Sequence, residues 1–146
     1  MRIIGFTLKK VLIERKNPPK GKTEIKSNIN IDNIEKEEVD ISERPSLKFD
    51  FTFSVNYEPE VASVEIKGSV IALDEKGESK EILKEWKKKR FESNLKTGLF
   101  NFILDKCNLK AIQLEEELGL PFHIPFPKLT PAPVQEKEKT SPKYAG

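Results

Sequence analysis

An unbroken alternation of apolar and polar residues between positions 47 and 57 constrains the fold of this chain more than any other feature. Successive side chains of a strand point to opposite faces of a sheet, so the pattern predicts a half-buried antiparallel strand. The apolar positions are Leu47, Phe49, Phe51, Phe53, Val55 and Tyr57.

A second strand is predicted directly after this one. Residues 61–73 keep most of their apolar side chains on even positions, and the sequence Glu58-Pro59-Glu60 supplies a turn between the two segments. Gly68 stands where an apolar side chain belongs, which indicates a bend, a bulge or a closely approaching neighbour. The two segments together predict a long hairpin.

Two further strands are predicted nearer the N-terminus. Residues 3–13 are rich in β-branched and aromatic types, with Ile4, Phe6, Leu8 and Leu12 on even positions. Val11 and Ile13 have the other parity, so either a bulge intervenes or both faces are partly covered. Residues 24–31 also alternate, whereas the acidic residues 32–45 predict a surface loop, with or without one helical turn.

Residues 80–91 fit two structures. Ile82, Leu83 and Trp86 share one face of a helix, whereas Ile82, Lys84 and Trp86 alternate as in a strand. Sequential strands joined by short turns usually pair, which favours a further long strand. Lys and Glu are good helix formers, which favours the helix, and the sequence leaves the choice open.

The apolar spacing changes to that of a helix after Ser93, which is placed to cap the N-terminus. Asn108 is a point where this helix can be interrupted before a second, shorter one that ends at Gly119. Residues 118–134 contain five prolines and predict an extended segment laid on the body of the protein by its apolar side chains.

These elements predict a single α+β domain over residues 1–131, in a chain of 146 residues. Its expected architecture is an antiparallel four-stranded sheet followed by one long and one shorter helix packed on it. Residues 132–146 predict a flexible charged C-terminal tail.

The composition disfavours most enzyme chemistry. One Cys and one His exclude a disulfide framework and a four-ligand zinc site of the usual kind within one chain. We expect His123 to be a packed or surface residue, Cys107 a buried inert thiol, and Glu115 and its two acidic neighbours solvated charges. No glycine-rich phosphate loop is present. The sequence therefore predicts a protein that is not an enzyme and has no cofactor or bound metal.

We expect a soluble cytoplasmic protein, because the sequence shows neither a membrane span nor a secretory signal. No stretch approaches the roughly 20 apolar residues of a membrane span, and the N-terminal apolar run is too short for a secretory signal. Abundant Lys and Glu with only two Gln are typical of a protein from a hot environment.

A basic run at residues 84–90 gives an alternative function. Its cations, flanked by Trp86 and Phe91, are of the types that hold phosphates and stack a base, which would suit an RNA- or ribosome-associated small protein. The surrounding glutamates and a net charge of only +2 weigh against this second choice. The candidate nucleic-acid-binding residues are Lys84, Lys87, Lys88, Lys89 and Arg90.

The supply of apolar side chains exceeds what the predicted helices can cover. A four-stranded sheet and nine phenylalanines leave aromatic surface that becomes either a self-contained core, an oligomer interface or a binding groove. A groove floored by Phe and edged by a proline-rich flap would accept extended apolar segments of other chains.

The order of elements resembles that of the SecB export-chaperone family. Hairpin 47–73, the helical stretch NLKTGLFNFILDKC at 94–107 and the segment LGLPFHIPFPKLTP at 118–131 are similar to its central strands, main helix and terminal segment. The resemblance implies a SecB-like holdase, linked to protein export, which binds unfolded or nascent polypeptide clients without nucleotide hydrolysis. It also implies a homo-oligomer, a dimer or a tetramer built as a dimer of dimers with helices at the contact.

The resemblance also suggests where clients would bind. The candidate polypeptide-binding residues are Phe49, Phe51, Phe53, Leu120, Phe122, Ile124 and Phe126. Family members that deliver clients to the SecA motor often use a Cys/His zinc-binding end, and residues 134–146 have neither residue type. Delivery by that contact is therefore in doubt, and a role in toxin–antitoxin control is neither selected nor excluded.

Overall fold

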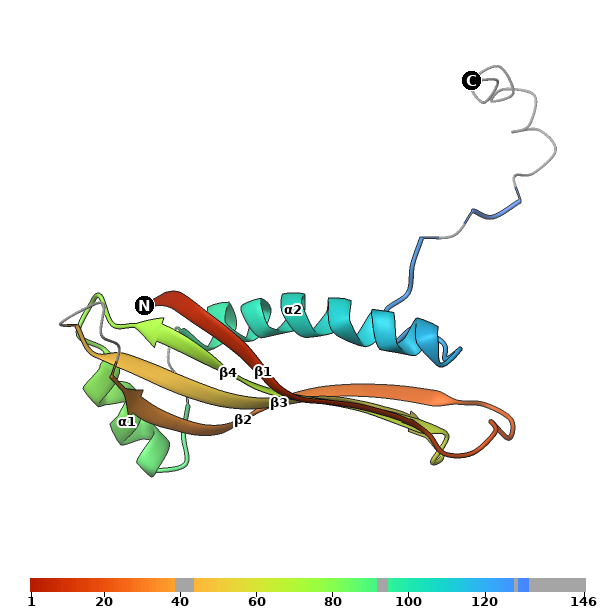
Figure 1. Ribbon diagram of the computed structural model, residues 1–146, viewed down its shortest axis with the longest axis horizontal. Helices are drawn as coiled ribbons and strands as arrows, with labels where there is room; N and C mark the ends of the chain where they lie inside the picture. The colour runs from red at the N-terminus through yellow and green to blue at the C-terminus, as the bar shows by residue number, and fades with distance from the viewer. Residues whose placement is uncertain (39–43, 92–94, 128, 132–146) are drawn as a thin grey trace, which may run out of the picture.

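A four-stranded antiparallel sheet forms the centre of the computed structural model, which describes residues 1–38, 44–91, 95–127 and 129–131 (Figure 1). The sheet has the order β1-β4-β3-β2, so β3 and β4 are central and β1 and β2 are edges. Together with two helices it confirms the predicted α+β class. The elements are β1 (Arg2–Arg15), β2 (Glu24–Glu37), β3 (Ser46–Glu58), β4 (Ala62–Leu73), α1 (Ser79–Lys87) and α2 (Leu95–Glu117).

The alternation in β3 divides the sheet into an apolar inner face and a charged outer face. All six odd positions from Leu47 to Tyr57 are at most 1% exposed, and they pair with the apolar even positions of β4. The outer face carries ion pairs, such as Lys48 with Glu35 at 2.7 Å and Lys10 with Glu65 at 3.2 Å. The predicted hairpin is therefore confirmed, and its buried side is the one that the helices cover.

Gly68 is required by a close approach of the neighbouring strand. A Cβ atom at this position would lie 2.4 Å from the carbonyl oxygen of Thr7 and 2.9 Å from Cζ of Phe51. Gly68 pairs with Leu8 on one side and with Phe51 on the other. Of the three explanations open from the sequence, the close neighbour is the correct one.

Two irregularities explain the mixed parity of β1. The register shifts between Ile3 and Gly5 and again between Leu8 and Lys10, so each shift moves the following side chains to the other face. Phe6, Leu8, Val11 and Ile13 thereby all pair with inner-face positions of β4 or with Gly68. The sequence predicted that a bulge was one solution, and the structure has two such shifts.

β2 is longer than predicted. It continues to Glu37 with one register shift between Ile31 and Asn33, so residues 32–37 are strand and not the predicted surface loop. Ile34 is 4% exposed and pairs with Phe49. It therefore anchors this part of β2 to the core, although the residues around it are mostly acidic.

Residues 79–87 form helix α1, so the preference for a strand over residues 80–91 is wrong. The cause lies just before the helix, at Asp74. One carboxylate oxygen of Asp74 accepts hydrogen bonds from the backbone N–H of Lys76 and Glu78, and the other accepts from the N–H and hydroxyl of Ser79. These contacts satisfy N–H groups that a helix start leaves without partners.

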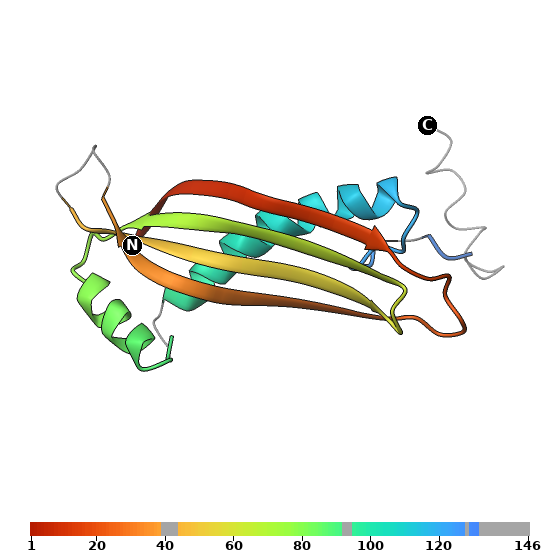
Figure 2. The same cartoon turned by 60° about the horizontal axis from the view of Figure 1, so that its bottom comes forward.

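α2 runs without interruption from Leu95 to Glu117, so the predicted break at Asn108 is wrong and the shorter helix is α1. Residues four apart, from Leu99 through Ile103 and Cys107 to Ala111, are fully buried against the sheet. α2 crosses the sheet diagonally on one side, and α1 lies at one end of the strands (Figure 2). The predicted cap Ser93 lies outside the described residues.

The chain turns at Gly119 and continues as an extended segment against the sheet. Gly119 has a φ of 66°, as the predicted end of the helix requires, and the N–H of Leu120 donates to the carbonyl of Glu115. The proline-rich prediction is thus confirmed for residues 118–127. The predicted flexible tail at 132–146 lies outside the described residues.

Candidate functional site

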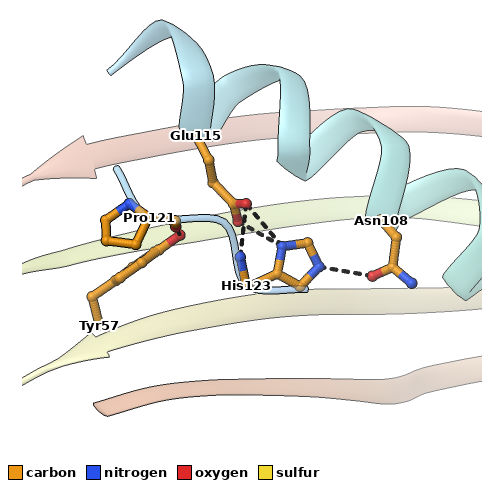
Figure 3. Close-up of polar contacts among 5 residues, drawn as sticks. All are labelled: Tyr57, Asn108, Glu115, Pro121 and His123. Atoms are coloured by element: carbon orange, nitrogen blue, oxygen red, sulfur yellow. Dashed lines mark hydrogen bonds and ion pairs between the residues drawn. The ribbon is translucent and has the colours of Figure 1, made fainter. Parts of the chain in front are cut away.

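A buried polar network fixes the extended segment to the end of α2 (Figure 3). The carboxylate of Glu115 accepts hydrogen bonds from the backbone N–H of His123 at 3.1 Å and from its ring Nδ1 at 2.8 and 2.9 Å. The other ring nitrogen, Nε2, lies 2.9 Å from Oδ1 of Asn108. The side chain of His123 is 2% exposed and that of Glu115 is 0% exposed, so the network is shielded from water.

Both nitrogens of the His123 ring have a polar partner. The carboxylate of Glu115 faces Nδ1, and the side-chain amide of Asn108 faces Nε2. Buried polar groups need such partners, because burial removes the water that would otherwise bind them. Together these contacts fix one position of the segment on the helix.

Two residues of the sheet strand β3 also contact the extended segment. The hydroxyl of Tyr57 donates to the carbonyl of Pro121 (Figure 3). The ring of Phe53 meets the ring of His123 edge-on at 5.9 Å. Burial raises the pKa of the Tyr57 hydroxyl well above its usual range, and the nearby charge of Glu115 adds to this. The hydroxyl of Tyr57 therefore keeps its proton, and with it the hydrogen bond, well into the alkaline range.

Sequence reasoning placed His123 correctly but missed its partners. His123 is packed, as predicted, whereas Glu115 is fully buried and the prediction of a solvated charge is wrong for it. Asn108 and Glu115 are seven residues apart, two helical turns, which places them on one side of α2. That spacing was a usable signal, although nothing in the sequence showed that His123 returns to the same side.

The predicted polypeptide-binding residues fall into two groups. The rings of Phe49, Phe51 and Phe53 are at most 1% exposed beneath the chain's own helices and segment, and Leu120 is 5% exposed. The expected aromatic floor is therefore not accessible in this structure. Phe122 and Phe126 are 38% and 46% exposed, and Ile124 between them is half-buried.

Phe122 and Phe126 form a defined pair on the surface. Their ring centroids are 5.0 Å apart at an interplanar angle of 86°, an edge-to-face contact. Phe122 lies between Pro121 and His123, whose contacts fix the backbone on both sides. The pair is thus displayed by a segment that the protein holds in place.

A second accessible apolar surface follows the edge strand β1. Leu8 and Val11 pair with inner-face positions and are 38% and 37% exposed. β1 has a neighbouring strand on one side, β4, so its other edge leaves backbone donors and acceptors unpaired in the sheet. Nη2 of Arg15, the last residue of β1, lies 3.3 Å from the carbonyl oxygen of Gly119, which brings this edge to the start of the extended segment.

α2 also presents apolar side chains away from its buried stripe. Leu104 and Leu114 are half-buried, and Leu109 is 67% exposed. A helix that is apolar around much of its circumference is usually covered on more than one side. Cys107 lies on the buried side, where burial raises the pKa of its thiol to about 12, so the thiol is unreactive as predicted.

The basic run lies at the end of α1 and in the turn after it. Lys84 and Lys87 are in the last turn of the helix, and Lys88, Lys89 and Arg90 follow it, all exposed. Among the residues that the structure describes, no group of three or more His, Cys, Asp or Glu side chains is placed to hold a metal ion. Neither described helix has the length and apolar character that crossing a bilayer requires.

Comparison with known proteins adds a likeness of fold. No family model matches the sequence, and no curated protein matches it. One similar solved structure is the SecB-like chaperone Rv1957 of Mycobacterium tuberculosis in complex with a ChAD peptide from the antitoxin HigA1 (Rv1956). The match covers 88% of this chain and 89% of that chain, at 11% sequence identity and a TM-score of 0.49. A likeness of this degree concerns only the general arrangement of sheet and helices, so function has to be inferred from the side chains of this chain.

Proposed function

We propose that the protein is a non-enzymatic, chaperone-like holdase that binds unfolded or nascent polypeptides. The observation that carries the proposal is the exposed pair of Phe122 and Phe126 on a backbone fixed by buried polar contacts. Aromatic rings held in a fixed position at the surface are typical of sites that bind apolar groups of other molecules. Because the sequence resembles the SecB export-chaperone family, we include a link to protein export in this proposal.

The binding energy of one such site suits reversible holding. Full burial of a Phe side chain yields roughly 1.5–3 kcal/mol, so covering the exposed parts of two rings yields only about 2 kcal/mol. Entropy lost by an unfolded client reduces that further. One site therefore holds a client weakly, and tight holding needs several sites that engage the same chain.

The edge of β1 supplies contacts that do not depend on client sequence. An extended client segment that pairs with this edge forms main-chain hydrogen bonds, and its side chains meet Leu8 and Val11. Because Arg15 connects the end of β1 to Gly119, a client on this edge can continue toward the aromatic pair. Together these surfaces favour extended apolar polypeptide as the bound species.

We further propose that the protein works as a homo-oligomer, a dimer or a tetramer. The support is the apolar surface of α2 around Leu109, which the described part of the chain leaves exposed. Assembly would bury this surface and place several aromatic pairs in one particle, which the weak single site requires.

Binding to a permanently unfolded polypeptide tests the proposal. Fluorescently labelled, reduced and carboxymethylated α-lactalbumin is titrated with the protein, while light scattering gives the mass of the complex. The double variant Phe122→Ser/Phe126→Ser is expected to bind at least tenfold more weakly, because it loses the exposed apolar area without touching the buried network.

A matched control removes similar apolar area elsewhere. Ile4 and Leu12 are 38% and 36% exposed, and neither is among the inner-face positions of β1 that contact the proposed client. Ile4→Thr/Leu12→Thr is expected to bind within twofold of the unaltered protein. Equal losses in both variants, or an unaltered protein that does not bind the unfolded chain, would overturn the holdase proposal.

A further inference from the structure

A pocket of about 290 Å³ lies where the end of α1, the edge strand β2 and the first turns of α2 meet. Ile31 of β2 forms part of one wall, and the basic turn after α1 and the N-terminal part of α2 form the rest. This pocket has no part in the proposed binding of apolar clients. Its principal lining side chains are Trp86, Lys89, Arg90, Lys96 and Phe100.

The turn that carries Lys89 and Arg90 is fixed by the backbone. The N–H of Lys89 donates to the carbonyl of Trp86, and the N–H of Arg90 donates to the carbonyl of Glu85, both at 2.9 Å. Lys89 has a φ of 59°, a left-handed conformation that a lysine adopts only where its surroundings hold it. The next residue, Phe91, stacks on Phe49 of the core at 6.0 Å.

The described lining of this pocket carries positive charge only. Among the described residues that line it there are three cations, Lys89, Arg90 and Lys96, and no carboxylate. None of the three forms an ion pair within the part of the chain that the structure describes, whereas Lys9, Lys10 and Lys48 of the sheet each have an acidic partner. Arg90 also borders a neighbouring pocket that Glu81 and Glu85 line, so the charge open to an external anion is centred on Lys89 and Lys96.

Aromatic faces accompany these charges. Trp86 and Phe100 are half-buried in the wall, and Nζ of Lys96 lies 5.7 Å from the centre of the Phe100 ring. Cations beside partly exposed rings form the surface on which proteins bind single-stranded nucleic acid, through phosphate contacts and base stacking. Lys84, Lys87 and Lys88 continue the positive charge along α1 beyond the pocket.

We propose that this pocket binds single-stranded nucleic acid, with one base on Trp86 and Phe100 and the adjoining phosphates on Lys89, Arg90 and Lys96. An acidic polypeptide would satisfy the cations but would leave the rings without a planar partner. The pocket is of a size to take one small planar group, and the charge beyond it suits a polyanion that continues along the surface. This activity is independent of the holdase activity.

The fluorescence of Trp86 gives a direct test, because it is the single tryptophan of the sequence. The full chain is titrated with a 12-nucleotide oligouridylate and with a 12-nucleotide oligothymidylate in 50 mM salt. We expect saturable quenching, and the difference between the two ligands shows whether RNA or DNA is preferred. Twelve-residue polyglutamate is the third ligand and is expected to bind at least tenfold more weakly.

Two variants test the residues, with labelled oligouridylate as the readout. Lys89→Gln/Arg90→Gln/Lys96→Gln is expected to bind at least tenfold more weakly and to lower the slope of log affinity against log salt by about 2. Phe100→Leu keeps all three charges and is expected to bind at least fivefold more weakly through lost stacking. Lys16→Gln/Lys20→Gln/Lys22→Gln removes the same charge from the β1–β2 connection and its edges and is expected to bind within twofold of the unaltered protein.

The contrary results are equally definite. Absence of saturable quenching by both oligonucleotides overturns the proposal. So does an equal loss in the Lys16, Lys20 and Lys22 control, because binding would then follow net charge alone. Polyglutamate that binds as tightly as oligouridylate, or full affinity in Phe100→Leu, would identify a site for acidic polypeptides instead.

Discussion

The carboxylate of Glu115 accepts hydrogen bonds from both the backbone N–H and the ring Nδ1 of His123. Through this pair the last turns of α2 hold the backbone between Pro121 and Ile124 in one position. The exposed Phe122 belongs to that stretch, so the buried hydrogen bonds determine where an apolar ring meets solvent.

Removal of His123 is expected to destabilise the protein strongly. His123→Ala leaves the fully buried carboxylate of Glu115 without the ring nitrogen that it contacts, and a buried group that loses its partner costs about 1–3 kcal/mol. The free energy of unfolding from urea titration measures the loss. Glu116→Ala, at the exposed neighbouring position, is expected to change it by less than about 0.5 kcal/mol. A similar small effect in His123→Ala would contradict a stabilising contact between His123 and Glu115.

Two glycines are expected to respond in opposite directions to the same substitution. Gly68→Ala forces a Cβ atom to within 2.4 Å of the Thr7 carbonyl oxygen, so β1 has to move, at a cost of about 1–3 kcal/mol. In Gly98→Ala the new Cβ meets nothing within 4 Å, and the lower flexibility of the unfolded chain stabilises α2 by about 0.5–1 kcal/mol. Thermal unfolding of both variants checks the signs, and destabilisation of equal size at both would be inconsistent with this packing.

The sheet is predictable from the sequence because its signal is local. The alternation at 47–57 and the turn at 58–60 determine which faces of β3 and β4 are buried, and the structure confirms them. β2 beyond residue 31 was missed because Ile34 stands alone among acidic residues and its parity changes at the register shift. One apolar residue in such a context does not distinguish a strand from a loop.

The site was harder to predict because its contacts join side chains and backbone groups from three different elements of the chain. The network joins Tyr57, Glu115 and Pro121, and no local pattern announces contacts between a strand, a helix and a proline-rich segment. The aromatic floor was predicted to be accessible because the apolar side chains exceed what the predicted helices can cover. In the structure, residues far away in the sequence also pack on these rings: Phe51 stacks on Phe6 of β1, and Phe53 meets the ring of His123.

Acid is expected to weaken the N-terminus of α1 through Asp74. Burial raises the pKa of this carboxyl, but hydrogen bonds from Ser79 and Glu78 outweigh burial and hold the pKa well below its usual range. A lowered folded-state pKa stabilises the fold above the unfolded value, about 3.9, and the contribution is lost as pH falls below it. Asp74→Ala is expected to be less stable by about 1–2 kcal/mol at pH 7, with a smaller difference at pH 2.5. Urea titrations at both pH values make the comparison, and a constant difference would contradict the assignment.

Alkaline conditions are expected to destabilise the protein through Cys107. Burial raises the pKa of its thiol to about 12, so above pH 9 the unfolded chain loses this proton and the folded chain keeps it. The stabilising contribution is complete below pH 9 and decreases above it, by up to about 1.4 kcal/mol per pH unit. Cys107→Ala removes this term, so the stability difference between variant and unaltered protein should shift in favour of the variant between pH 8 and pH 10.5. A difference that does not change with pH would show that the thiol titrates normally.

Loss of one hydroxyl from Tyr57 is expected to loosen the extended segment while leaving the sheet intact. Tyr57→Phe keeps the buried ring but leaves the carbonyl of Pro121 without its donor, which costs about 0.5–1.5 kcal/mol. The effect should be local, because the segment has few apolar anchors besides Leu120, whereas the strands are held by complete ladders. Hydrogen exchange checks this: the amide of His123, which donates to Glu115, should exchange roughly threefold to tenfold faster, because the lost contact lowers the free energy of local opening. The amide of Val64 in β4 should change less than the amide of His123. Equal acceleration at both amides would mean that the segment and the sheet open as one unit, and the aromatic pair would then be part of the core's cooperative structure instead of a separately fastened surface.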